Sequence, residues 1–251
     1  MVHGSKISRR QFLSLSGATL GGLVLTACTR TTGSQAVEKV TAEPAVRDAN
    51  DALQRLQSGN LRYATNKTID LNQTPRRRVE VARGQHPFAT VLGCVDSRVP
   101  PELIFDRGLG DLFVIRTAGQ VLDQAVLGSI EFGFMELGIH LIVVLGHENC
   151  GAVKATIEAV EKKLQVEGSV GYLVRSLTPA VEKAMQAEPA ETGEEPDVPF
   201  DLVAETVDTN IRMIVDQLAA SAEFSEAIVA GTLRIVGGRY DLDTGLVEFI
   251  A

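Results

Sequence analysis

Two short segments of this 251-residue chain combine side chains that bind metal ions. The first contains Cys94, Asp96 and Arg98, and the second contains His147 and Cys150 in the pattern His-x-x-Cys-Gly. Two thiolates, one imidazole and one carboxylate suit a tetrahedral Zn²⁺ site, because soft and borderline ligands favour zinc over Mg²⁺ or Ca²⁺. The predicted ligands of one zinc ion are therefore Cys94, Asp96, His147 and Cys150.

Two alternatives for these cysteines stay open at this point. A cysteine at the end of a strand is often only a small buried hydrophobe. In an exported chain, Cys94 and Cys150 could also form a disulfide. Neither alternative explains why Asp96 and His147 accompany them, so the metal site is favoured.

Three short apolar runs must position these side chains, at residues 88–93, 112–115 and 141–146. The runs are rich in β-branched residues and do not alternate with polar residues, which is typical of strands buried on both faces of a parallel sheet. Ligands of such sheets bind beyond the carboxyl ends of the strands. The two ligand segments follow the first and third runs, so we expect them to meet at one edge.

Segments with apolar residues at helical spacing lie between or after these runs, at residues 122–137, 152–163 and 203–218. This alternation predicts an α/β fold: a single domain with a central, mainly parallel sheet flanked by helices. A helix with one apolar face is also expected over residues 44–63. Two final apolar runs flank Asp243-Thr244-Gly245 and predict a closing hairpin. An acidic stretch, residues 186–199, is expected to be a surface loop.

The N-terminus has the pattern of an export signal, with basic residues before an apolar run over residues 12–27. That run is shorter than the roughly 20 apolar residues of a spanning helix. Ser8-Arg9-Arg10-Gln11-Phe12-Leu13 resembles a twin-arginine signal. Leu25-Thr26-Ala27-Cys28 resembles a lipobox, which would make Cys28 a lipid acceptor; the alternative is an ordinary signal peptide with a chance cysteine.

These patterns divide the chain into three parts: an export signal over residues 1–27, a flexible tether over 28–44 and a folded domain over 45–251. We expect an exported protein, periplasmic or at the cell surface, anchored to the membrane as a lipoprotein. With 24 basic and 32 acidic residues, the formal net charge of −8 argues against nucleic acid as a partner. Three cysteines are too few for a disulfide framework.

Beyond the ligands, the sequence resembles the β-class carbonic anhydrases from about residue 45 to 250. The similar blocks are residues 94–102, 110–119, 129–132, 146–152 and 240–245. The resemblance implies the reversible hydration of CO₂ to bicarbonate and a proton, with one zinc ion per chain. It makes Cys94, His147 and Cys150 the zinc ligands. Asp96 and Arg98 correspond to the catalytic dyad of the family.

In physical terms, zinc lowers the pKa of bound water to about 7 and so makes hydroxide available. Arg98 can grip the Asp96 carboxylate in a bidentate pair. Asp96 paired with Arg98 leaves the fourth metal position open, whereas Asp96 on zinc closes it. The sequence alone does not decide between these two arrangements.

The resemblance also implies a substrate pocket and an oligomer. The pocket residues carried over from the family are Gln85, Phe113, Phe132 and Gly151. Phe132 stands where many members have Tyr, so a hydroxyl is missing there. The implied assembly is a homodimer or homotetramer in which the N-terminal helix clasps a neighbour.

Two other functions compete with CO₂ hydration. The same fold and zinc set can hydrolyse CS₂ or COS. A lipid-anchored protein without catalytic activity could instead buffer or deliver zinc, or serve as an assembly module. The Asp96–Arg98 pair, Gln85 and Phe113 count against this second class, because metal delivery needs no CO₂ pocket.

Overall fold

The computed structural model describes residues 44–187 and 200–250. The predicted export signal, the lipid acceptor Cys28 and nearly all of the tether lie outside these residues, as does most of the acidic stretch. No helix in the described part of the chain has the length and apolar character needed to cross a membrane.

A five-stranded sheet forms the centre of the domain, in the order β2-β1-β3-β4-β5. The first four strands are parallel and the last pair is antiparallel. This arrangement confirms the predicted mainly parallel sheet and shows the closing hairpin. The strands are β1 (Ala89–Cys94), β2 (Leu112–Thr117), β3 (Leu141–His147), β4 (Arg234–Tyr240) and β5 (Val247–Phe249).

The register of the strands brings the two ligand segments together. Cys94 ends β1 opposite Thr117 of β2, and His147 ends β3 opposite Tyr240 of β4. Because β1 also pairs with β3, with Gly93 opposite Leu145, both ligand strands end at the same edge. Every residue of β1 and β3 is buried, as their continuous apolar runs predicted, whereas the edge strand β2 is half-buried.

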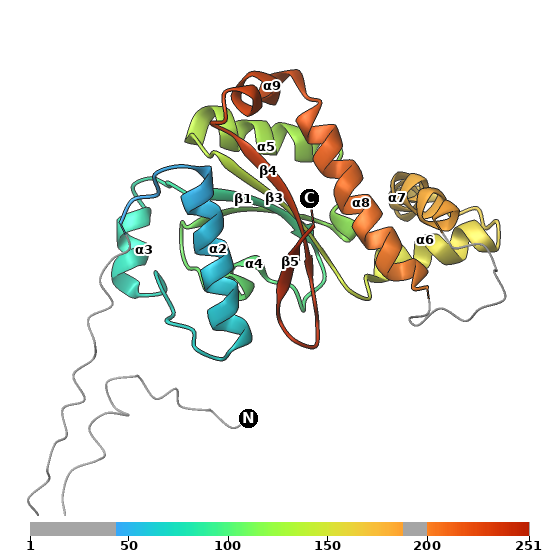
Figure 1. The fold of residues 1–251 in the computed structure, drawn as a ribbon, viewed down its shortest axis with the longest axis horizontal. Helices are drawn as coiled ribbons and strands as arrows, with labels where there is room; N and C mark the ends of the chain where they lie inside the picture. Colours follow the sequence, from blue (N-terminus) through green and yellow to red (C-terminus); the bar gives the residue numbers. More distant parts are fainter. Residues whose placement is uncertain (1–43, 188–199, 251) are drawn as a thin grey trace, which may run out of the picture. The chain divides into compact units, whose positions relative to one another are not determined.

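Helices surround the sheet, and Figure 1 shows α2 and α3 on one side of the view and α6 and α7 on the other, beyond α8. The helices are α2 (Ala49–Ala64), α3 (Pro75–Val81), α4 (Pro101–Ile104), α5 (Gln124–Leu137), α6 (Gly151–Glu161), α7 (Gly168–Gln186), α8 (Leu202–Ala219) and α9 (Ala222–Val229). A short 3-10 turn, η1 (Ala118–Gln120), follows β2. The helix expected from residue 44 begins only at Ala49, because Asp48 caps it by accepting from the Asp51 N–H.

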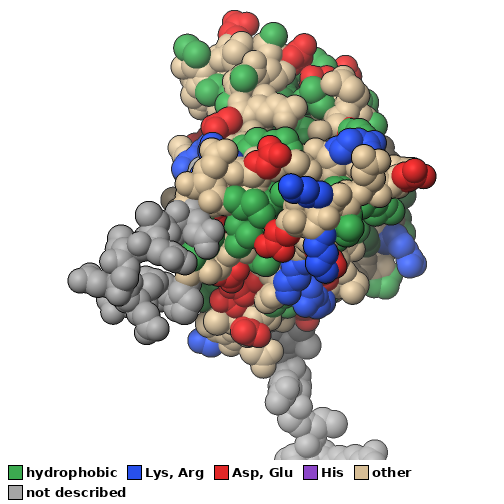
Figure 2. Space-filling view, turned by 90° about the vertical axis from the view of Figure 1, so that its right-hand side faces the viewer, with side chains coloured by type: hydrophobic (Ala, Val, Ile, Leu, Met, Phe, Trp, Pro, Cys, Tyr) green, Lys and Arg blue, Asp and Glu red, His purple; other side chains and the backbone are tan. Residues whose placement is uncertain are grey.

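Close packing of α8 on the sheet depends on a glycine of β3. A Cβ atom added at Gly146 would lie 2.6 Å from Cδ1 of Ile211 on α8. The missing side chain lets α8 approach the strand just before its metal-binding end. On the outer face shown in Figure 2, acidic and basic side chains are mixed with apolar ones, so the net negative charge is not gathered into one patch on that face.

Candidate metal centre

Three of the predicted ligands meet at the carboxyl edge of the sheet. Cys94 ends β1, His147 ends β3, and Cys150 is the residue that caps α6 at its N-terminus. One ligand atom from each of these residues lies within 4.8 Å of the other two, and all three residues are buried. Cys94 and Cys150 are free cysteines, so the disulfide alternative does not describe this structure.

His147 is oriented as a metal ligand would be. Its Nδ1 lies 2.8 Å from the backbone oxygen of Glu148. Because a carbonyl oxygen can only accept, Nδ1 must carry a proton, and in the neutral imidazole Nε2 then presents a lone pair. Nε2 is buried and has no hydrogen-bond partner within the described chain. A buried acceptor without a partner is costly, and a bound metal ion would satisfy it.

The charge state of the two thiols also fits a cation site. A hydrogen bond from Cys150 lowers the pKa of Cys94 to about 4, while burial opposes this change. That same hydrogen bond, together with burial, raises the pKa of Cys150 well above its ordinary value. The site thus accepts one thiolate readily but resists a second, since two buried anions repel each other. A divalent cation would remove that repulsion and favour both thiolates.

Asp96 pairs with Arg98 in this structure. Arg98 Nη2 donates to Oδ2 of Asp96 at 2.8 Å, and Nε donates to Oδ1 at 3.0 Å. The Arg98 backbone N–H adds a third bond to Oδ1 at 2.9 Å. These bonds, the guanidinium bond first, hold the pKa of Asp96 well below its usual range. Asp96 therefore stands in the open arrangement and is not part of the three-ligand group among the described residues.

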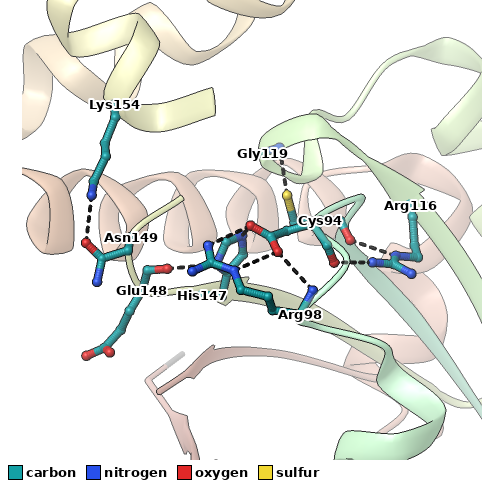
Figure 3. A network of polar contacts seen from close by, with 9 residues as sticks. Cys94, Arg98, Arg116, Gly119, His147, Glu148, Asn149 and Lys154 are labelled. Atoms are coloured by element: carbon teal, nitrogen blue, oxygen red, sulfur yellow. Dashed lines mark hydrogen bonds and ion pairs between the residues drawn. The ribbon is translucent and has the colours of Figure 1, made fainter. Parts of the chain in front are cut away.

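The Asp96 carboxylate still faces the ligand cluster, because Oδ2 lies 4.0 Å from Nε2 of His147. The segment that carries Asp96 is fixed by two residues, Arg116 and Gly119. Neither of them was assigned a role from the sequence. Arg116 of β2 donates to the backbone oxygen of Cys94 at 2.7 Å and to that of Asp96 at 2.6 Å. The Gly119 N–H donates to Sγ of Cys94 at 3.4 Å, and Figure 3 shows both residues approaching Cys94. Their only sequence signal is their place in the block 110–119, which resembles the family.

The second ligand segment is held by the neighbouring strand and by α6. The Glu148 N–H donates to the backbone oxygen of Tyr240 on β4 at 3.0 Å. Backbone N–H groups at the start of α6 favour the anionic form of Cys150. Gly151, predicted for the pocket, is the exposed first residue of α6, and a Cβ added there would meet nothing within 4 Å. The space that a side chain at residue 151 would occupy is therefore open.

The other three predicted pocket residues lie elsewhere. Gln85 is exposed in the loop between α3 and β1. Phe113 and Phe132 stack with ring centroids 6.4 Å apart, on β2 and α5. Phe113 lies four residues before Thr117, the register partner of Cys94, which corresponds to roughly 13 Å along the strand. The chain thus does not bring these three side chains to the ligand cluster.

Comparison with known proteins gives one consistent family. The family model described as "Carbonic anhydrase" matches residues 89–247. A carbonic anhydrase of Mycolicibacterium smegmatis is 40% identical over 197 residues, which cover 78% of this chain and 91% of that protein. Carbonic anhydrase 2 of Mycobacterium tuberculosis is 41% identical over 196 residues, covering 77% and 89%.

Solved structures with the same fold include a β-carbonic anhydrase from Coccomyxa in complex with acetazolamide. It has a TM-score of 0.58 and 28% identity, covering 68% of this chain and 74% of that one. A structure from a study of two tetrameric β-carbonic anhydrases of Sordaria macrospora has a TM-score of 0.60 at 22% identity, covering 80% and 98%. At 22% identity, the similarity to the Sordaria macrospora structure shows only that the two chains share a fold.

Proposed function

The chain belongs to the β-class carbonic anhydrases, and we propose that it hydrates CO₂ reversibly to bicarbonate and a proton with one zinc ion bound per chain. Cys94, His147 and Cys150 would hold the ion. The buried lone pair on Nε2 of His147 is the observation that carries this assignment, because no described group of the chain satisfies it. When bound, zinc supplies a nucleophile at neutral pH by lowering the pKa of coordinated water to about 7.

Asp96 is proposed to orient the nucleophile by accepting a hydrogen bond from it. Its carboxylate faces the ligand cluster, and the depressed pKa keeps it ionised at neutral pH. An ionised carboxylate can only accept hydrogen bonds, so it directs a lone pair of the nucleophile toward the carbon of CO₂. The position of Asp96 therefore decides which way the nucleophile points.

Arg98 is proposed to keep the fourth metal position available. It donates to both oxygens of the Asp96 carboxylate, so this pairing competes with coordination of the metal by Asp96. Without Arg98, Asp96 would be free to turn toward the metal as a fourth ligand. Four protein ligands make a closed structural site, whereas three with an open position make a catalytic one.

The substrate pocket and the assembly extend this proposal. Gln85, Phe113 and Phe132 are proposed to line the pocket, and no described contact joins them to the ligands of their own chain. A homodimer or homotetramer is proposed to supply what one chain lacks. Export and lipid attachment at Cys28 remain proposals from the sequence.

The test is a stopped-flow assay of CO₂ hydration with the zinc-loaded full chain and with the same protein after zinc removal by a chelator. The expected result is turnover that is lost with the metal and restored by added zinc. Parallel assays with COS and CS₂ distinguish the hydrolase alternative. Hydrolysis of COS or CS₂ without CO₂ hydration would overturn the assigned reaction. Tight zinc binding with none of these activities would support a protein that only binds metal.

A further inference from the structure

A short chain of hydrogen bonds connects the candidate ligand Cys94 to helix α8. The Gly119 N–H in η1 donates to Sγ of Cys94 at 3.4 Å. The Gly119 carbonyl oxygen accepts a bond from Nδ2 of Asn210 at 3.1 Å. Both bonds are buried; the first joins residues 25 positions apart in the sequence and the second joins residues 91 positions apart. Gly119 therefore contacts the sulfur of Cys94 through its N–H and helix α8 through its carbonyl oxygen.

The η1 turn needs such support because its backbone is not in a relaxed conformation. Gly119 has φ 65° and ψ 24°, and Gln120 follows with φ 46°. Left-handed backbone at a residue other than glycine persists only where surrounding structure holds it. A Cβ atom added at Gly119 would lie 2.9 Å from Cδ1 of Leu177 and 3.3 Å from Cβ of Ala152. Three helices thus confine this turn: α6, α7 and α8.

The buried side chain of Asn210 is placed to fix the orientation of the Gly119 peptide group in η1. Asn210 is 5% exposed. Its neighbour Ile211 packs against Gly146, one residue before the ligand His147. The same stretch of α8 therefore contacts the end of β3 and the η1 turn beside Cys94. Asn210 donates to the only backbone acceptor that Gly119 offers, so it fixes the plane of that residue and the direction of its N–H.

We propose that Asn210 is a positioning residue for the metal centre, which acts through Gly119 to aim an N–H donor at the sulfur of Cys94. This inference rests on the proposed function, in which Cys94 binds zinc. A hydrogen bond to a ligating thiolate fixes its orientation and withdraws negative charge from the sulfur. Less charge donated by sulfur leaves the metal a stronger Lewis acid, which partly offsets the two thiolates of this site.

The test compares two substitutions on the same buried face of α8. Asn210→Leu keeps the approximate shape of the side chain but removes the donor. Thr206→Val is the matched control, because Thr206 lies one helical turn earlier, is fully buried, and has an Oγ1 with no hydrogen-bond partner among the described residues. Zinc affinity is measured by competition with a chromogenic chelator. The thiolate-to-metal charge-transfer band is measured after substitution with Co²⁺.

Asn210→Leu is expected to weaken zinc binding about tenfold and to shift the charge-transfer band, since outer partners of metal ligands contribute about 10–100-fold in affinity. Thr206→Val should leave both measurements at the wild-type values. Equal behaviour of the two variants, in affinity and in spectrum, would overturn the inference. If Asn210→Leu fails to fold, shown by its circular dichroism, then Asn210→Ala, which removes the donor with less bulk, decides by the same two measurements.

Cys94→Ser separates this inference from the proposed function. Loss of zinc in Cys94→Ser, together with unchanged binding in the Asn210 variants, refutes only the role of Asn210. Full zinc retention in Cys94→Ser refutes the ligand assignment itself, and with it the basis of this inference.

Discussion

The carboxyl edge of the sheet, which carries Cys94, His147 and Cys150 and is called the metal edge below, differs from the surface that carries Phe132. The difference is how far one chain by itself buries and holds the side chains of each region. At the metal edge Cys94, His147 and Cys150 are 4%, 1% and 2% exposed, and each is held by a neighbouring backbone or side-chain group. Phe132 is 47% exposed, and Gln85 is exposed in its loop. One chain therefore assembles the candidate metal ligands, while Phe132 and Gln85 remain exposed on its surface.

Strand geometry explains this difference. Parallel strands in register end at one edge, so residues that follow β1 and β3 converge without any further device. Phe113 sits earlier on β2, and Phe132 projects from the second half of α5, so neither can share that edge. If a neighbouring chain covers them, changes at the two regions should have separable effects.

The largest effect is expected at the metal edge from Cys150→Ser. A serine hydroxyl is a harder and much less acidic ligand than a thiol, so the variant should lose most of its zinc and all measurable turnover. Elemental analysis of the purified protein measures the zinc content. Zinc at one equivalent per chain in this variant would contradict the ligand assignment.

Arg98→Ala should separate metal binding from catalysis at the same edge. Without the guanidinium, Asp96 is free to turn toward the metal, so turnover should fall by about a hundredfold or more while zinc is retained. The measurements are stopped-flow CO₂ hydration and zinc content on the same sample. A wild-type rate would show that the Asp96–Arg98 pair has no part in the reaction.

Phe132→Arg tests the second region. A charge placed in an apolar contact between copies of the chain would be buried without a partner, so assembly should weaken by roughly a hundredfold or more. Zinc content should stay unchanged. Size exclusion with light scattering measures the assembly, and Val229→Arg is the matched control, because Val229 is 89% exposed on α9. A monomeric wild-type protein would contradict the oligomer itself.

The smallest effect is expected from Asp123→Ala, at the start of the helix that carries Phe132. The Asp123 side chain accepts from the Val126 N–H at 2.9 Å and caps α5. Its loss should lower the free energy of unfolding by about 1 kcal/mol and leave zinc affinity unchanged. Denaturant unfolding measures the first quantity. A loss of zinc affinity would show that α5 is coupled to the metal edge.

Local patterns in the sequence predicted much of the architecture but not all of it. The apolar runs gave β1 and β3 because continuous β-branched sequence has few other stable arrangements. The helix α7 carried no prediction, although it confines η1 beside Cys94 through Leu177. The helix α2 begins at Ala49, five residues after the start that the pattern predicts, because the Asp48 side chain caps it there.

By itself, the sequence determined the types of the metal ligands and their places after two strands, since residue type and spacing are local properties. The tertiary structure decided the rest of the site. It placed Asp96 on Arg98, the choice that the sequence had left open. It also brought Arg116 and Asn210 to backbone oxygens of the metal edge. Every residue has such an oxygen, so only the folded geometry determines which ones these side chains reach.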